Sequence, residues 1–424
     1  MASLYSSRAA RLAQETRMTP MTAHSVPLFL WLVIALCCAA TCHAALTALL
    51  HPGSRGAPAS RRNESAAASS ASFFAPVSVL KPLCGAEPRL HANLETFCQQ
   101  AHPAYQLLFG VASAADPAAS VVQRLARAYP ERDIELVIDA TVHGSNRKVS
   151  NLINLATRAK HGLIVIADSD IAVEPDYLAR VTAPLADKGV GIVTCLYDAR
   201  CVGGFWSRIG ALFIDQWFAP SVHMANACGY GRFGFGATLA LTRDTLDECG
   251  GFEALRDCLA DDYWLAENVR ALGLRTVLSD VVVATDVTER DLASLWSRET
   301  RWLRTIRSIN PIGFAFLCIT FTSPWLIASA LLGLGFENGA QFTADTIVDL
   351  STSLGLSARL LLHWRSSGSW RAFLRDLPLI PLRDALMLLQ WLAALFGSSV
   401  MWRGVRVPLD DTRERYDANA SDSQ

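Results

Sequence analysis

Two aspartates, Asp168 and Asp170, directly follow the apolar run 163–166. Two carboxylates this close repel each other unless a positive group lies between them. Hard divalent cations take oxygen ligands, and Mg²⁺ typically uses one or two carboxylates together with substrate phosphates. The pattern therefore suits a site for a cation, Mg²⁺ or Mn²⁺, and a diphosphate. The alternative interpretation is a plain turn, because Asp is also common at helix caps.

A second acidic pair, Asp261 and Asp262, opens a segment of helical spacing that contains Trp264, Leu265 and Val269. Acidic residues at a helix start complement the helix dipole, so capping alone can explain the pair. A carboxylate held by a rigid helix start is also suited to be a general base, which contributes ~10²–10⁴-fold to a rate. Asp262 is the candidate base, and Asp261 is a candidate supporting residue.

A basic stripe follows, in which Arg298, Arg301, Arg304 and Arg307 recur every third residue beside Trp302. Arginines just before a membrane helix are the expected cytoplasmic flank of that helix. The alternative is that one or two of them bind a diphosphate, which the guanidinium fork fits well.

Glycines and one lysine complete the set of candidates. Gly229, Gly231 and Gly234 spell G-x-G-x-x-G, but the motif precedes a strand-like run, whereas a dinucleotide fingerprint opens a helix. We expect Gly234 and Gly236 instead to let the backbone pass close to a ligand or to a neighbouring loop. Lys148 lies at a helix start, where it is either solvated or a phosphate contact.

A regular fold must position these residues, and the hydrophobic pattern predicts one. Leu90, Leu94 and Phe97 share one helix face, for example, and such helical segments alternate with short apolar runs. The predicted strands are 77–85, 105–113, 133–141 and 162–168, and the predicted helices are 90–100, 118–130 and 148–161. This alternation predicts an α/β domain with a parallel sheet and helices on both faces. Ligands bind such sheets beyond the carboxyl ends of the strands, where Asp168 and Asp170 fall.

The pattern is less regular after Asp170. The predicted elements are a helix at 176–189, a strand at 190–200, a long helix at 207–227, a glycine-rich loop leading into a strand at 229–244, a helix at 258–273, a strand pair at 275–287 and an amphipathic helix at 291–309.

Hydrophobic residues make up 51% of the chain and are concentrated in a few segments. No charged residue occurs between Arg17 and Arg55, and a spanning helix needs ~20 apolar residues, more than the ~7–15 of a cleaved signal peptide. We therefore predict a retained signal anchor at 25–50. Two further spans are predicted at 311–336 and 378–402. The amphipathic segment 341–363 either spans within a bundle or lies in the interface.

The predicted organisation follows from these segments. It comprises a tail (1–24), the anchor (25–50), an Ala/Ser/Pro/Gly-rich flexible linker (51–74), the α/β domain (75–307), a C-terminal membrane region (308–402) and a second tail (403–424). The net charge of −1 does not favour a nucleic-acid partner. Eleven scattered cysteines indicate reduced thiols rather than a disulfide framework, so we expect the α/β domain to face the cytoplasm.

In the order of its motifs, the chain resembles the ceramide glucosyltransferase family (glycosyltransferase family 21, close to family 2). Within that group it is most similar to the bacterial glycosyltransferases of hopanoid biosynthesis. The motifs that carry the resemblance are VSVLKPLCGAEPRLHANLETFCQQAHPAYQLLFGV, HGSNRKVSNLINL, VIADSDIAVEPDYL, GFGATLALTRD, LADDYWLAE and RETRWLRTIR, from about residue 76 to residue 309.

The resemblance implies a GT-A nucleotide-sugar-binding domain that faces the cytoplasm and is held by several membrane segments, in the bacterial inner membrane. It implies inverting transfer of a sugar from a UDP-sugar to a lipid hydroxyl. Asp168 and Asp170 match the family's metal–diphosphate motif, and Asp262 matches its catalytic base. The (Gln/Arg)-x-x-Arg-Trp motif, which closes on the diphosphate and the acceptor, is matched by Arg298, Arg301 and Trp302.

Three positions on the donor side follow from the resemblance. Lys148 and Lys81 match donor-side positions. The family's first aspartate, which recognises uridine, aligns with Ser113, and Asp116 either substitutes for it or only matches the family's following Asp-Pro.

Alternative functions stay open at the level of sequence. The resemblance suggests N-acetylglucosamine transfer to a bacteriohopane polyol, with glucose transfer to ceramide as the second reading. A processive polysaccharide synthase shares the Arg-x-x-Arg-Trp motif, although three or four spans are few for a channel. A membrane-tethered nucleotide-sugar binder without turnover is favoured only by Ser113.

Overall fold

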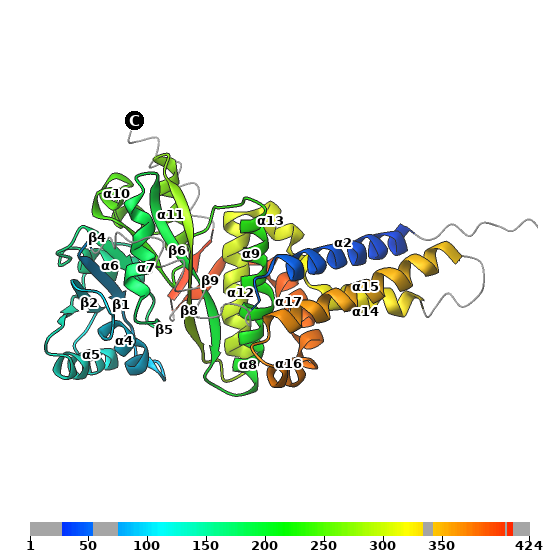
Figure 1. The fold of residues 1–424 in the computed structure, drawn as a ribbon, viewed down its shortest axis with the longest axis horizontal. Helices are drawn as coiled ribbons and strands as arrows, with labels where there is room; N and C mark the ends of the chain where they lie inside the picture. The colour runs from blue at the N-terminus through cyan, green and yellow to red at the C-terminus, as the bar shows by residue number, and fades with distance from the viewer. Residues whose placement is uncertain (1–27, 54–74, 334–341, 403–404, 410–424) are drawn as a thin grey trace, which may run out of the picture.

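The computed structural model describes the residues in four ranges, 28–53, 75–333, 342–402 and 405–409 (Figure 1). The predicted tail 1–24, most of the predicted linker 51–74 and nearly all of the predicted tail 403–424 lie outside the described residues.

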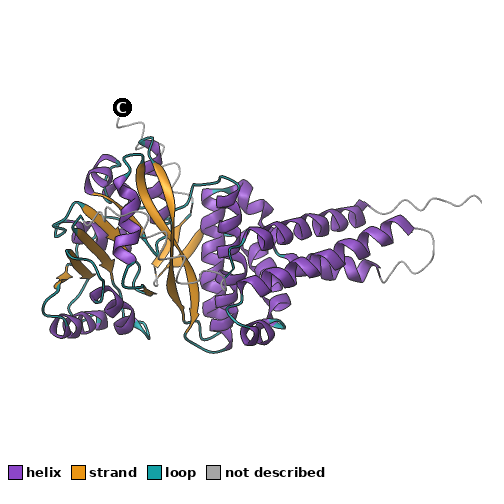
Figure 2. Ribbon diagram, viewed as in Figure 1, coloured by secondary structure: helices purple, strands orange, loops and turns teal. Residues whose placement is uncertain are grey.

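An eight-stranded sheet with the strand order β3-β2-β1-β4-β7-β6-β8-β5 forms the centre of the α/β part (Figure 2). The strands are β1 (Val77–Pro82), β2 (Tyr105–Val111), β3 (Asp133–Ile138), β4 (Leu163–Ile166), β5 (Ile171–Ala172), β6 (Val190–Cys201), β7 (Leu239–Thr242) and β8 (Arg275–Val287). Strand β7 is antiparallel to both of its neighbours and β5 is antiparallel to β8, whereas the other pairs in this sheet are parallel. The predicted α/β fold with a mostly parallel sheet is confirmed.

Helices cover both faces of this sheet, because its central strands are apolar on both sides. One core contains Val79 and Val165 and is covered by α4 (Leu90–Cys98), α5 (Pro117–Ala128) and α7 (Tyr177–Thr182). The opposite core contains Leu80 and Ile166 and is covered by α6 (Arg147–Ala156), α10 (Arg243–Glu248) and α11 (Asp261–Ala271).

Two predicted elements differ from the structure. The expected strand pair at 275–287 is a single long strand, β8, because β8 pairs with β6 along its length and accommodates the break as a bulge opposite Thr194 and Leu196. The helix expected at 176–189 ends at Thr182 and continues as a 3₁₀ turn, Ala183–Ala186, since Pro184 cannot donate an α-helical hydrogen bond.

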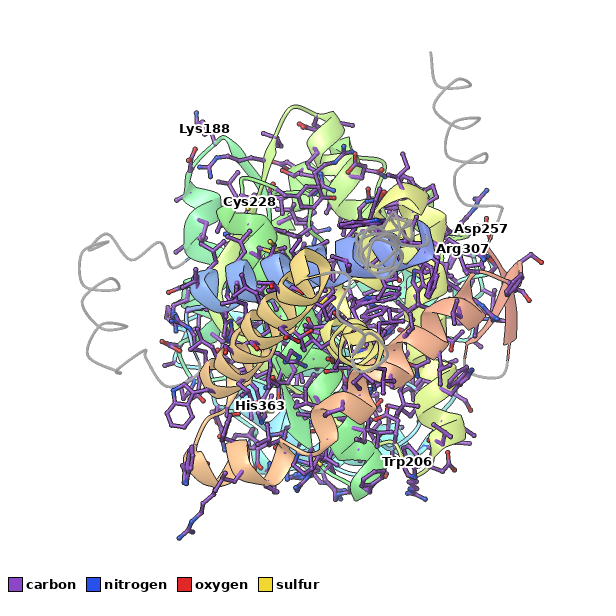
Figure 3. All side chains as sticks on the ribbon, turned by 90° about the vertical axis from the view of Figure 1, so that its right-hand side faces the viewer. Lys188, Trp206, Cys228, Asp257, Arg307 and His363 are labelled. Atoms are coloured by element: carbon purple, nitrogen blue, oxygen red, sulfur yellow. The ribbon has the colours of Figure 1, made fainter. Side chains whose placement is uncertain are left out.

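Three helices project from the other end of the molecule (Figure 1). They are α2 (Leu28–Leu50), α14 (Thr322–Gly333) and α15 (Phe342–Ser366), and they lie side by side when viewed from that end (Figure 3). Gly355 allows this close packing, since a Cβ there would lie 2.4 Å from Leu326 Cδ2 and 2.5 Å from Thr41 Oγ1. Small residues commonly permit such close approach between membrane helices.

One described helix, at Trp31–Leu50, is long and apolar enough to cross a membrane by itself. This position agrees with the predicted anchor. Two bent helix pairs each reach the required length and hydropathy only when taken together. One pair joins Pro311–Thr320 to Thr322–Leu332 at 54°, and the other joins Trp370–Asp376 to Leu379–Ala394 at 56°.

The C-terminal segments differ from the expected spans in their limits. The helix α17 (Leu379–Ala394) ends well before residue 402, and β9 (Ser399–Trp402) pairs with β10 (Val405–Pro408) as an antiparallel two-stranded sheet. The segment expected at 341–363 forms the continuous helix α15, which packs against α2 and α14.

A layer of helices lies between the sheet and the projecting helices (Figure 1). It consists of α8 (Phe205–Phe213), the π-helical turn η2 (Ile214–Phe218), α9 (Ala219–Ala227), α12 (Leu292–Ile309), α13 (Pro311–Phe316), the 3₁₀ turn η4 (Leu317–Thr320) and α16 (Trp370–Asp376). Because α9 packs on α2 and α12 packs on α17, this layer joins the α/β part to the apolar helices.

A buried ion pair fixes this junction. Glu299 of α12 accepts hydrogen bonds from both terminal nitrogens of Arg383 on α17, at 3.1 and 2.7 Å, and both side chains are almost fully buried. Removing one member of a buried pair leaves an uncompensated charge, which costs more than the pair itself contributes.

We therefore expect Arg383→Met to lower the free energy of unfolding by up to about 3–5 kcal/mol, since the buried Glu299 then keeps only its longer contact with Arg298, at 3.4 Å. Arg371→Met, at an exposed position of α16, should change it little. The double change Glu299→Met and Arg383→Met should recover much of the loss, since neither charge is then buried alone. Thermal unfolding of the purified protein in detergent measures all three, and equal stability of Arg383→Met and the wild type would contradict the role of the pair.

Candidate active site

A cavity of about 770 Å³ lies beyond the carboxyl ends of the central strands. Asp168 and Asp170 line it just after β4, and Asp261 and Asp262 line it at the start of α11. Residues from α12 close the side that faces the helical layer. The cavity therefore lies where ligands bind in sheets of this kind, and it joins the two acidic pairs that are about ninety residues apart in the sequence.

The Lys148 ammonium group connects the two acidic pairs. Its Nζ lies 3.0 Å from Asp168 Oδ1 and 3.2 Å from Asp261 Oδ2. Burial alone would lower the pKa of Lys148, but the charges of Asp168, Asp261 and Asp262 raise it above the usual lysine value. Lys148 is thus cationic and holds the end of β4 against the start of α11.

The position of Lys148 depends on the start of α6. The side chain of Asn146 caps this helix by accepting the N–H groups of Lys148 and Val149. Its amide also donates to the Cys258 carbonyl at 2.7 Å and to Asp261 Oδ1 at 3.4 Å. The same residue therefore orients Lys148 and the acidic start of α11.

The Asp262 carboxylate is held by two backbone N–H groups. Its Oδ2 accepts from Gly236 at 2.8 Å, and its Oδ1 accepts from Tyr263 at 2.9 Å. Burial, together with the charge of Asp261, raises the pKa of Asp262 to about 6. A carboxylate fixed in a cavity with a pKa close to neutrality is suited to accept a proton.

Asp170 lies deeper in the same cavity. The Thr285 hydroxyl donates to Asp170 Oδ2 at 3.2 Å, and the Asp286 N–H donates to its carbonyl oxygen at 3.0 Å. Burial raises the pKa of Asp170, and the charges of Asp168 and Glu87 raise it further. A carboxylate destabilised in this way by its neighbours gains most from a bound cation.

The residues present fit a divalent cation that binds together with a phosphate ligand. Among the described residues, no group of three or more His, Cys, Asp or Glu side chains is arranged to hold a metal. Asp168 and Asp170 provide two carboxylates that open onto the cavity, and Mg²⁺ commonly takes its remaining ligands from water and substrate phosphates.

The glycine-rich loop approaches these groups closely, as expected from the sequence. A Cβ on Gly234 would lie 2.4 Å from the Asp262 carbonyl oxygen. A Cβ on Gly236 would lie 3.0 Å from Asp168 Oδ2, 3.1 Å from Lys148 Nζ and 3.3 Å from Asp262 Oδ2. The carboxylates of Asp168 and Asp262 therefore converge on one point, which only a residue without a side chain leaves open.

The arginines of the α12 stripe fall into two groups, one that lines the cavity and one that contacts the C-terminal segment. Arg301 and Trp302 line the cavity. Arg298 also lines it but forms ion pairs with Glu289 and Glu299 and lies over the Trp302 ring, 5.0 Å from its centre.

The last two arginines of the stripe hold the C-terminal segment. Arg304 donates to the Ser399 carbonyl, and Arg307 donates to the carbonyls of Ala394 and Gly397. Their contacts are structural.

Two residues expected on the donor side have contacts that the sequence did not reveal. Lys81 is fully buried and does not line the cavity; its ammonium donates to the Asp168 carbonyl at 2.7 Å and lies 3.6 Å from the centre of the Phe97 ring. Burial lowers the pKa of Lys81 to about 7. Asp116 lines the cavity, but it caps α5 and accepts the Gly85 N–H at 3.0 Å. Ser113 is exposed and accepts the N–H of Ala115.

Sequence reasoning missed several residues of the cavity wall. These are Glu87 and Thr285 near the aspartates, and the aromatic residues Tyr197, Phe213, Trp217, Phe218 and Phe235. Glu87 accepts a hydrogen bond from Ser169, between the two aspartates, at 3.1 Å. The aromatic residues stand in segments predicted as strand, helix or loop, where nothing in the local pattern marks them as lining a cavity.

The site combines three chemical capacities. Two carboxylates can hold a cation and, with Arg301, a diphosphate; a third carboxylate, Asp262, can accept a proton; and an aromatic surface can hold an apolar ligand. Such a site can transfer a group from a diphosphate ester to a hydroxyl that belongs to an apolar molecule.

The fold and the site thus define a glycosyltransferase, in agreement with the resemblance seen in the motifs. The family description "Glycosyl transferase family 21" matches residues 27–414. The chain belongs to this family.

Its relatives include ceramide glucosyltransferases. Ceramide glucosyltransferase 1 of Caenorhabditis elegans is 28% identical over 236 residues, which cover 55% of this chain and 50% of the relative. Ceramide glucosyltransferase 3 of the same organism is 27% identical over 232 residues, covering 54% and 50%. The chain spans about half the length of these curated relatives. The hopanoid acceptor and the identity of the sugar stay predictions.

Two solved glycosyltransferase structures are among those to which the chain is similar. A mannosyltransferase from Pyrobaculum calidifontis, in complex with GDP-Man and Mn²⁺, has a TM-score of 0.46 and 20% identity, covering 86% of this chain and 97% of that one. Glucosyl-3-phosphoglycerate synthase from Mycobacterium tuberculosis, with Mn²⁺ and UDP-glucose, has a TM-score of 0.33 and 16% identity, covering 60% and 84%.

We expect Gly236→Ala to lower kcat by up to ~10-fold, because the added Cβ would crowd the carboxylates of Asp168 and Asp262 and shift them by less than the ~1 Å that can cost ~10²-fold. The matched control is Gly231→Ala in the same loop, where a Cβ would meet no atom within 4 Å. Steady-state transfer kinetics and thermal unfolding of both variants test this. Equal activity of the two variants would argue against a close approach of the loop to the carboxylates.

The pH profile of transfer should report on Asp262. Its protonated form cannot accept a proton, and its pKa is about 6, so activity should rise through about pH 6 and level off above it. The profile is measured at saturating divalent cation, since protonation of Asp170 competes with the cation. The Asp247→Asn variant, changed at an exposed position of α10, should keep the same profile. If the activity instead rose with a midpoint near pH 4, the ordinary pKa of an Asp side chain, the raised pKa of Asp262 would be contradicted.

Proposed function

We propose that the protein transfers a sugar from a UDP-sugar to the hydroxyl of a membrane lipid, with inversion at the anomeric carbon. The convergence of Asp168 and Asp262 on the space beside Gly236 is the observation that supports this most directly. It brings a candidate cation ligand and the candidate base close to each other, so that one bound sugar can meet both.

In the proposed reaction, the acceptor oxygen attacks the anomeric carbon while the bond from that carbon to the diphosphate oxygen breaks. The electron pair of the broken bond leaves with the diphosphate, and the proton of the acceptor hydroxyl passes to Asp262. A single attack from the side opposite the leaving group inverts the configuration. Fixing both reactants and the base in one cavity supplies the orientation that the reaction needs.

The residues of the donor side stabilise the departing charge. A divalent cation held by Asp168 and Asp170 would neutralise part of the diphosphate charge. Arg301 adds a guanidinium that can bind phosphate oxygens through two hydrogen bonds. Lys148 holds the Asp168 side chain in place through an ion pair. Lys81, whose side chain lies on the face of the sheet that α4 covers, holds the Asp168 backbone by donating to its carbonyl oxygen. Both lysines thus act by positioning the cation ligand.

The acceptor is a lipid in this proposal. The aromatic side of the cavity and the adjoining apolar helices support it, as do the ceramide glucosyltransferases among the relatives. For the sugar and lipid we propose N-acetylglucosamine and a hopanoid polyol such as bacteriohopanetetrol, on the motif resemblance. Glucose transfer to ceramide is the second candidate, favoured by the named relatives. We further propose that the enzyme spans the membrane several times, with its α/β domain in the cytoplasm.

The central test compares the lipids of cells that contain and lack the protein, by mass spectrometry. We expect a glycolipid that disappears with the protein, and its fragments identify both the sugar and the lipid. Restoring the wild-type protein should restore this lipid, whereas Asp262→Asn should not, because loss of a general base costs ~10²–10⁴-fold in rate. Identical lipids in both cells, or full transfer by Asp262→Asn, would argue against the proposed reaction.

A further inference from the structure

Six aromatic side chains form a continuous surface on one side of the cavity, which we call the aromatic wall. Its members are Tyr197 of β6, Phe213 of α8, Trp217 and Phe218 of η2, Phe235 of the glycine-rich loop and Trp302 of α12. Tyr197 and Phe218 stack with ring centres 4.9 Å apart, and Phe213 lies 4.9 Å from Trp217 and 5.3 Å from Trp302.

One end of the aromatic wall lies at the candidate base. Phe235 directly precedes Gly236, whose N–H binds Asp262. Burial, together with the negative charge of Asp262, raises the pKa of Tyr197, which lines the same cavity and stays protonated. An acceptor whose hydroxyl reaches Asp262 can therefore place its next atoms against this aromatic surface.

The other end of the aromatic wall lies at the membrane helices. Trp217 Nε1 donates to Thr320 Oγ1 at 2.7 Å, and its ring lies 6.1 Å from the Phe321 ring. Thr320 and Phe321 stand at the break of the bent pair Pro311–Thr320 and Thr322–Leu332. Trp217 thus separates the cavity from a helix pair that is apolar enough to span a membrane.

The turn that carries Trp217 is fixed from its other faces. Asp215 accepts the Ala199 N–H at 2.9 Å, and Arg359 donates to Gln216 at 3.4 Å. Arg359 is itself buried and paired with Asp384 of α17 at 3.1 Å. The π-helical geometry of Ile214–Phe218 places these anchors and the aromatic side chains on different faces of the turn, and such turns are frequent at functional sites.

We infer that the aromatic wall holds the apolar part of the acceptor lipid next to its reactive hydroxyl, and that Trp217 limits how bulky this part can be. The inference rests on the proposed lipid glycosylation and adds a specificity-determining residue to it. The wall favours an apolar occupant, because it is continuous with the apolar cluster around Phe321 and Met387. Replacing Trp217 by a smaller side chain opens the cavity toward the bent helix pair.

The test compares two acceptors in detergent with the same UDP-sugar. One is a slim single-chain alkyl alcohol, and the other has a bulky ring system or a branch directly beside its hydroxyl. We expect Trp217→Ala to raise the ratio of kcat/KM for the bulky acceptor over the slim one by about 10-fold or more, since one methylene in a pocket is worth ~10–200-fold in discrimination. Trp217→Phe, which keeps a ring, should shift the ratio in the same direction and less.

Two controls separate the side chain's bulk from other effects. Thr320→Val removes the hydrogen-bond acceptor of Trp217 but keeps the ring, and it should leave the ratio within about 2-fold of the wild type. The rate of UDP release without acceptor measures how well each variant uses the donor. The transfer rates of each variant are divided by this rate before they are compared. An unchanged ratio in both Trp217 variants would overturn the inference while leaving the proposed function intact.

A photolabel provides a second measurement that does not depend on activity. An alkyl alcohol with a diazirine beside its hydroxyl should label the segment that contains Trp217 and Phe218, and excess unlabelled acceptor should suppress the label. Labelling confined to other segments would overturn the inference. Absence of both UDP release and transfer in the wild type would instead overturn the proposed function.

Discussion

The Lys148 ammonium between Asp168 and Asp261 is the contact on which the site depends. Carboxylates from two segments far apart in the chain meet in this cavity and would repel one another without a cation between them. Lys148 provides that cation in the folded chain itself, and Asn146 sets its position by capping α6 and binding the start of α11. The cluster can therefore form before any substrate or metal binds, and a cation bound at Asp168 would meet an arrangement that is already in place.

The same cavity joins two ligands of opposite character. Its acidic edge suits a charged donor with a cation, whereas the aromatic wall suits an apolar acceptor. Helix α12 borders both sides, because Arg301 and Trp302 line the cavity and Glu299, on another face of the helix, pairs with Arg383 of α17. A helix held in this way by α17 connects the position of the candidate catalytic groups to the apolar helices at the other end of the molecule.

The sequence predicted best those features for which the local hydrophobic pattern and the residue types point to the same element. The strands that end near Asp168, the helix that begins at Asp261 and the close passage of Gly234 and Gly236 are all found where the pattern placed them. Prediction was weaker for residues whose partners are distant. The arginines of α12 form one regular stripe in the sequence, yet their roles differ because Arg304 and Arg307 face the C-terminal segment. Lys81 matched a donor-side position, but its side chain points to the face of the sheet that α4 covers and lies against Phe97.

Spacing and residue type are enough to specify the alternation of strands and helices, the acidic pairs at element ends and the apolar anchor, since each depends on neighbours within a few turns of chain. The family follows from the same motifs in order. Only the folded chain decides which of these charged groups meet, because a pKa or an ion pair depends on distances between segments that the sequence does not contain. It also decides that Trp217 lies between the cavity that contains the candidate base and the bent helix pair Pro311–Thr320 and Thr322–Leu332.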